Sequence, residues 1–220
     1  MTVAILGIVT VGPAWGASFD FEDQPVDTSQ NGSNTSIVMI DSGLTVTITR
    51  SSGASFDVLN PEQAGFPGPF PDAYPVNWGQ QALSPVANND VADFFIATFS
   101  ELVFSFSLEA GDFGMDPDEI FLEAFSGIDG TGISLGTDSI VWNGDFGLNT
   151  GDPSDPPVTL SVASGQGFRS VIFYSRSDDP DFVFSTYFDN LMATTVPEPS
   201  SALLLGLGLA GFAAVRRRTH

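Results

Sequence analysis

Alternation of apolar and polar residues recurs through the middle of the chain and predicts β-strands. Residues 44–49 and 158–162 alternate strictly, which is the period of a strand with one buried face. The segment 101–109 shows the same period and predicts a strand with one apolar face. That face consists of Leu102, Phe104, Phe106 and Leu108.

Three further segments extend this pattern. Residues 170–175 are apolar on both faces, as expected of a central strand, and 182–191 predict a long last strand. Although Glu119 and Glu123 have helical spacing, we interpret 120–125 as a strand that opens a hairpin. Several short strands separated by turn residues predict an all-β domain, a single β-sandwich. The turns lie at 129–132, 143–145, 152–157 and 177–180.

The first residues of the chain have a different character. Residues 1–17 carry no charged side chain, and an apolar run at 3–11 precedes the small residues Ala14 and Ala17. This order predicts a signal peptide cleaved after Ala17, although no Lys or Arg precedes the apolar run. The alternative is a buried first strand. Acidic sequence begins abruptly after Ala17, which favours the signal peptide.

The last residues form a second apolar segment. Residues 202–215 are uncharged and are followed by Arg216, Arg217 and Arg218. As a helix, 201–215 is about 22 Å long at ~1.5 Å per residue, a marginal span for a hydrocarbon core of about 30 Å. The arginines place the C-terminus in the cytoplasm. The chain thus divides into a signal peptide at 1–17, a β domain at 18–193 and a C-terminal segment at 194–220.

This C-terminal segment resembles the PEP-CTERM sorting signal of Gram-negative, exopolysaccharide-producing bacteria. The resemblance rests on the Val-Pro-Glu-Pro motif at 196–199, the apolar helix and the terminal arginines, in that order. It implies transient anchoring in the inner membrane, processing by an exosortase, and delivery to the cell surface or extracellular matrix. Pro197, Glu198 and Pro199 are then recognition residues for the exosortase.

The charge of the chain excludes several classes of function. It has 27 acidic side chains against six arginines, no lysine, no cysteine and one histidine, His220. Residues 18–196 alone hold 26 acids and three arginines, a formal charge of −23. Nucleic-acid binding is excluded, because it depends on basic side chains. Disulfides, thiolate metal sites and Ser-His-Asp catalysis also lack their residues.

The order of features in the body is similar to that of jelly-roll domains of the carbohydrate-binding and galactose-binding kind. The similarity is carried by 19–22, 103–112 and 188–191. It implies that the first and last strands lie side by side and that acids there hold a structural calcium ion. Glu22 and Asp189 are the matching positions, with Asp23 as a further candidate.

Calcium is the metal that the composition itself favours, because it is a hard cation with oxygen ligands. A second candidate cluster is the turn that contains Asp112, Asp116 and Asp118. It lacks the Asp-x-Asp-x-Asp-Gly spacing of an EF-hand loop. The alternative for both clusters is that their acids are solvated.

Three aromatic residues are candidates for stacking on sugar rings: Tyr74 and Trp78 in the Pro/Gly-rich segment 60–85, and Trp142. The alternative for each of the three is that the ring packs in the core or anchors a loop.

We therefore expect a non-catalytic protein with an adhesive or structural role in an exopolysaccharide or biofilm matrix. The alternatives are a calcium-dependent, lectin-like polysaccharide-binding domain and, less favoured, a glycoside hydrolase, which needs only two carboxylates.

Overall fold

The computed structural model describes residues 15–25, 34–59, 81–85, 93–112, 118–142, 156–177 and 186–195. Throughout this part the long regular elements are strands, so the predicted all-β class is confirmed. The strands are β1 (Trp15–Phe19), β2 (Ile37–Asp41), β3 (Leu44–Arg50), β4 (Phe56–Leu59), β5 (Ala82–Pro85), β6 (Phe95–Asp112), β7 (Asp118–Phe125), β8 (Ser134–Trp142), β9 (Val158–Ser177) and β10 (Thr186–Thr195).

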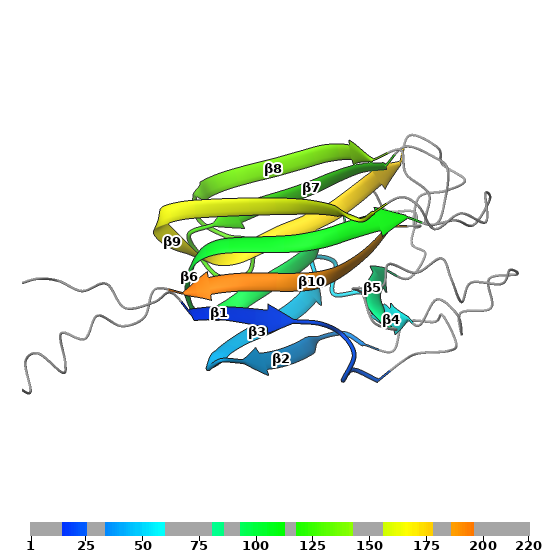
Figure 1. The fold of residues 1–220 in the computed structure, drawn as a ribbon, viewed down its shortest axis with the longest axis horizontal. Coiled ribbons are helices and arrows are strands. Elements are labelled where there is room, and N and C mark those ends of the chain that lie inside the picture. The colour runs from blue at the N-terminus through cyan, green and yellow to red at the C-terminus, as the bar shows by residue number, and fades with distance from the viewer. Residues whose placement is uncertain are drawn as a thin grey trace, which may run out of the picture. The chain divides into compact units, whose positions relative to one another are not determined.

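These strands form one antiparallel sheet (Figure 1). Its main order is β4-β5-β10-β6-β9-β7-β8, with β1 beside β10, and β2 and β3 attached through β6. The long strand β6 has different neighbours at its two ends: residues 95–99 pair with β3, and 105–112 pair with β10. In the same way, 170–177 of β9 pair with β7, whereas 158–163 pair only with β6. The sheet therefore has two halves, joined by the β6–β9 pair.

A bend separates the two halves. The register between β6 and β9 shifts between Thr98 and Ser105, and Figure 1 shows β9 turning back on itself at one end. Gly167 in β9 has a φ of 70°, which glycine adopts without steric cost. A Cβ atom there would lie 3.2 Å from the ring of Phe104. The bend thus depends on a residue without a side chain.

The same register shift corrects one prediction. Leu102 does not share the core-facing side of β6 with Phe106 and Leu108, because it is 44% exposed. Its neighbour Val103 is fully buried instead. Strict alternation fails here because a shift by one residue exchanges the two faces of a strand.

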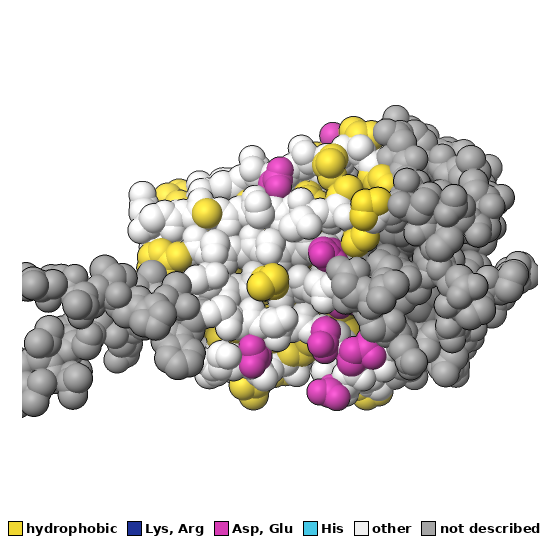
Figure 2. Space-filling model, in the orientation of Figure 1, with side chains coloured by type: hydrophobic (Ala, Val, Ile, Leu, Met, Phe, Trp, Pro, Cys, Tyr) yellow, Lys and Arg dark blue, Asp and Glu magenta, His cyan; other side chains and the backbone are white. Residues whose placement is uncertain are grey.

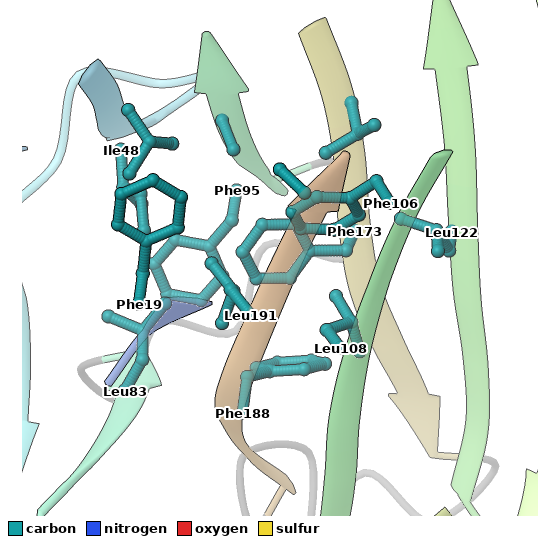
Figure 3. Packing of buried hydrophobic residues seen from close by; sticks show 14 of the residues in the cluster. Phe19, Ile48, Leu83, Phe95, Phe106, Leu108, Leu122, Phe173, Phe188 and Leu191 are labelled. Atoms are coloured by element: carbon teal, nitrogen blue, oxygen red, sulfur yellow. The ribbon is translucent and has the colours of Figure 1, made fainter. Parts of the chain in front are cut away.

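Side chains from both halves of the sheet meet in one hydrophobic core (Figure 3). Phe95 and Phe173, on neighbouring strands of one half, stack with ring centroids 5.3 Å apart. Phe188, from β10 in the other half, meets Phe173 edge to face at 5.0 Å and Phe95 at 6.0 Å. Such offset and edge-to-face pairs stabilise the core beyond the area that they bury.

Most of the predicted strands are confirmed, with changes in their ends. Residues 44–49 fall in β3, whose side chains alternate between buried and half-buried, and 120–125 fall in the β7–β8 hairpin. The segments 158–162 and 170–175, predicted as two strands, are parts of the single strand β9. The last strand is β10, which extends beyond the predicted end at 191 to Thr195.

The ends of the chain lie largely outside the described residues. Of the predicted signal peptide, only residues 15–17 are described, and they begin β1. The predicted C-terminal helix is outside the described part. Within that part, we find no helix with the length and apolarity needed to cross a membrane.

Candidate functional site

The site centres on Asp189, in the Phe-Asp-Asn-Leu sequence of β10. Phe188 and Leu191 on either side are buried in the core, and Asp189 itself is 0% exposed. Neither of its carboxylate oxygens has a hydrogen-bond partner. A buried carboxylate without a partner is costly, because it loses its hydration and gains nothing in return.

A β-bulge shapes this part of β10. The register with β6 shifts between Asp189 and Met192, and Asn190 has a φ of 49°. Asparagine tolerates this left-handed conformation better than most residues. Its side-chain Nδ2 donates a hydrogen bond of 2.9 Å to Oε2 of Glu109. Glu109 is the residue of β6 directly opposite Asp189.

The segment that follows β1 supplies two more carboxylates. Phe19 and Phe21 are buried there, whereas Asp20 is exposed and Glu22 is half-buried. Oε1 of Glu22 accepts a hydrogen bond of 2.8 Å from the backbone N–H of Gln81. Figure 2 shows acidic side chains grouped at the end of this face where β1 ends and β10 begins.

Gln81 contributes a third buried oxygen without a partner. Its side-chain Nε2 donates to the backbone oxygen of Glu22 at 2.9 Å, which directs the amide toward the segment after β1. The amide oxygen Oε1 is buried and has no hydrogen-bond partner. Gln81 and Asp189 thus leave three buried acceptor oxygens unpaired, and both residues lie near Glu22.

These surroundings strongly raise the pKa of the Asp189 carboxyl group. Burial raises the pKa of Asp189 to about 8, and the negative charges of Asp20, Glu22 and Glu109 act in the same direction. The nearby N–H of Asn190, which is outside hydrogen-bond geometry with either oxygen, offsets only part of this effect. Without a cation, Asp189 therefore carries a proton at neutral pH.

The donor set fits an oxygen-coordinated cation. Carboxylate and amide oxygens are the ligands that Ca²⁺ takes in proteins, and the unpaired oxygens of Asp189 and Gln81 would gain a partner. The side chains do not form a closed cage as they stand. Among the described residues, no three Asp, Glu, His or Cys side chains lie close enough together to hold a metal ion. The predicted pair of Glu22 and Asp189 is nevertheless brought into electrostatic contact.

The other predicted site residues lie elsewhere. Asp112 ends β6 and Asp118 begins β7, whereas Asp116 is outside the described residues. Trp142 ends β8 in the hydrophobic core and is 7% exposed, which favours packing over sugar stacking. The remaining candidates are also outside the described residues: Tyr74, Trp78, Pro197, Glu198, Pro199, Arg216, Arg217 and Arg218.

Three members of the site were not predicted: Asp20, Gln81 and Glu109. Asp20 lies two residues before the predicted Glu22, so its position in the sequence could have indicated that its charge also acts on this site. Nothing in the sequence distinguishes Gln81, because its role depends on the pairing of β5 with β10.

Comparisons with known proteins give two kinds of match. Residues 195–218 match the family described as PEP-CTERM protein-sorting motif. A solved structure, titled "Crystal Structure Analysis of the K2 Cleaved Adhesin Domain of Lys-gingipain (Kgp)", is similar with a TM-score of 0.51 and 15% identity. The match covers 82% of this chain and 100% of that chain. No curated protein matches the chain.

The first match confirms the predicted sorting signal. A PEP-CTERM motif implies a secreted exosortase substrate that is anchored in the membrane before processing and is delivered to the cell surface. The second match concerns the fold alone, and it agrees with the all-β architecture described above.

Proposed function

We propose that the β domain is a non-catalytic adhesive or structural module of the exopolysaccharide or biofilm matrix of a Gram-negative bacterium. The observation that carries this proposal is the position of the sorting motif, which begins at residue 195, where β10 ends. The segment that is processed thus directly follows the last strand of the β domain. Similarity to an adhesin domain is compatible with this role.

The test is to follow the full chain in an exosortase-containing host. We expect processed protein in the cell-surface and matrix fractions, and weaker attachment of cells that lack the chain. Glu198→Ala serves as the sorting control, because it leaves the β domain unchanged. Processed protein that is released freely into the medium, with unchanged attachment, would contradict an adhesive role.

We assign the domain, at finer detail, to the jelly-roll-like β-sandwiches. This assignment is supported by the bend in the β6–β9 pair and by the contacts of Phe188 with Phe95 and Phe173 across the core. In a sandwich, the inner faces of two sheet layers pack on one another in this way.

Calcium-dependent carbohydrate binding is the second candidate function, and the unpaired oxygens at Asp189 favour it. Asp189 and Gln81 would hold the ion, with Glu22, Asp20 and Glu109 supplying negative charge around it. Bound calcium would supply positive charge that keeps Asp189 ionised. It would thereby fix β10 against the segment that follows β1.

Thermal unfolding of the full chain in calcium and in chelator tests this binding. A ligand at 100 times its dissociation constant stabilises a protein by about 2.7 kcal/mol, so we expect a clear rise in midpoint. Asp189→Asn should abolish the rise, whereas Asp138→Asn, on β8, should retain it. An equal midpoint in calcium and chelator would exclude a structural calcium ion.

Processing at the N-terminus is a further part of the proposal. Cleavage after Ala17 would remove Trp15, Gly16 and the buried Ala17 from β1 and make Ser18 the first residue of the secreted protein. The nitrogen of Ser18 lies 2.8 Å from Oδ2 of Asp41, so its new ammonium group would meet a carboxylate. Sequencing of the secreted protein from its N-terminus should begin at Ser18, and any other start would displace this cleavage site.

A further inference from the structure

An aromatic pair lies on the side of the sheet opposite to the core. Phe121 of β7 and Tyr174 of β9 are directly opposite one another in the strand register. Their rings stack with centroids 4.9 Å apart and an angle of 17° between the planes. Both side chains are half-buried, whereas their neighbours Leu122 and Phe173 point into the core.

Arg176 lies over this pair. Its guanidinium carbon is 5.1 Å from the ring centroid of Phe121 and 5.2 Å from that of Tyr174. Nη2 also donates to the hydroxyl oxygen of Tyr174 at 3.4 Å. Arg176 is exposed, in contrast to Arg50, which is buried and paired with Asp93. It therefore offers hydrogen-bond donors at the surface of a very acidic domain.

A hollow of about 240 Å³ adjoins the rings. Phe121 and Tyr174 form its apolar part, and Glu123, Thr137 and Ser139 add polar side chains from β7 and β8. In the register of the β7–β8 hairpin, Ser139 faces Phe121 and Thr137 faces Glu123. The hollow thus combines aromatic carbon, two acidic residues (Glu123 and Asp138) and two hydroxyls, and the guanidinium group of Arg176 lies over the same two rings.

We propose that this hollow binds one neutral pyranose unit of a glycan. The C–H faces of a sugar ring pack on aromatic carbon, while its hydroxyls donate to Glu123 and accept from Arg176. The volume is below the roughly 300–1,000 Å³ of pockets for drug-sized ligands, which suits a single ring. This proposal rests on the proposed role in a polysaccharide matrix and assigns a site to it.

The charges favour a neutral sugar over an acidic one. Glu123 lines the hollow, and Glu119 lies opposite Arg176 in the strand register. Residues 18–196 carry a formal charge of −23, which repels polyanions over a distance of about 8–10 Å at physiological salt. A uronic acid would therefore meet two carboxylates for one arginine.

A second hollow provides the matched control. It has a volume of about 390 Å³ and lies over β6, β9 and β10, lined by Ser105, Ser107, Ser161, Met192 and Thr194. Met192 is exposed, but the described lining contains no exposed aromatic ring. Met192→Ala removes exposed apolar surface from this second hollow without affecting the aromatic pair.

The experiment is a glycan array with neutral and acidic glycans, followed by calorimetry of the full chain with the best neutral oligosaccharide. We expect binding to neutral glycans and a loss of about tenfold (about 1.4 kcal/mol) in Tyr174→Leu, which keeps apolar bulk without a ring. Arg176→Gln, at an exposed position, should weaken binding severalfold. Tyr174→Phe and Met192→Ala should bind as the wild type does.

Absence of neutral glycan binding, binding that survives both Tyr174→Leu and Arg176→Gln, or a preference for acidic glycans would each overturn the proposal. Its failure is distinguishable from failure of the adhesive role. Normal attachment by a Tyr174→Leu, Arg176→Gln double variant would refute this site and leave the adhesive role standing.

Discussion

Replacing Asp189 by asparagine should change how the stability of the calcium-free domain depends on pH. The carboxyl group has a pKa of about 8 in the folded protein, raised mainly by burial, against about 3.9 in an unfolded chain. Between these two values the folded state holds a proton that the unfolded state has lost. The free energy of unfolding therefore falls as pH rises through this window, and it levels off above pH 8.

The size of the effect follows from the difference between the two pKa values. Each unit corresponds to about 1.4 kcal/mol, so stability at pH 7 should be about 4 kcal/mol lower than at pH 4 on account of this group alone. Asp189→Asn removes this contribution. The difference in stability between variant and wild type should therefore grow in favour of the variant from pH 5 to pH 8.

Urea unfolding in chelator at pH 5, 6, 7 and 8 measures this difference. Glu101→Gln is the matched control, because it also removes one negative charge but at an exposed position. Excess calcium should reverse the order at pH 8, since the ion binds a charged carboxylate more tightly than the neutral amide that replaces it. Parallel pH profiles for wild type and Asp189→Asn in chelator would refute the reasoning.

Three further predictions concern the ion pair, the core and the sorting motif. Burial acts to raise the pKa of Asp93, but hydrogen bonds from Ser52 and Ser51 and the charge of Arg50 lower it. Arg50→Met removes the ion pair and leaves the bonds from both serines, so urea unfolding should show a loss smaller than the ~3–5 kcal/mol of a fully unpaired buried charge. Because the pKa of Asp93 is lowered in the folded wild type, the part of this stabilisation that depends on its charge should be lost as pH falls below about 3.8. Phe188→Ala should cost about 3–5 kcal/mol of unfolding free energy, and a loss below 1 kcal/mol would show that the rings do not meet as described. Glu198→Ala, or deletion of 216–220, should leave uncleaved precursor in the membrane fraction, and normal processing of both would argue against their role in recognition.

The strands were predictable where one face is buried and the other is not. In β3, Leu44, Val46 and Ile48 are buried and the threonines between them are half-buried, as the alternation indicates. The joining of 158–162 to 170–175 in one strand was not predictable. Ser164 to Gly167 contains residues typical of a loop, and only the pairing of β9 with β6 on both sides of it makes the strand continuous.

The strands β2 and β8 were also not predictable from their own pattern of apolar and polar residues. Val38 and Ile40 of β2 are exposed, so their apolar character did not mark a buried face. In β8 most side chains are exposed, and the strand is defined by its register with β7. Pairing with a neighbour can stabilise a strand whose own pattern is weak, because the hydrogen bonds belong to the backbone.

The sequence indicated that carboxyl groups form the candidate site, but it did not indicate that the carboxyl group of Asp189 is buried. Residues 18–196 contain 26 carboxyl groups, and the sequence offers no measure of which one loses its contact with water. Asp189 differs from the others because Phe188 and Leu191 hold its strand in the core, while the bulge at Asn190 directs that side chain to Glu109. The charges that raise its pKa further come from residues up to 169 positions away in sequence, Asp20 and Glu22. An ion that binds there would act on β10 near the start of the strand, whereas the sorting motif begins where the same strand ends, so calcium would stabilise the last strand of the domain at a distance from the processed segment.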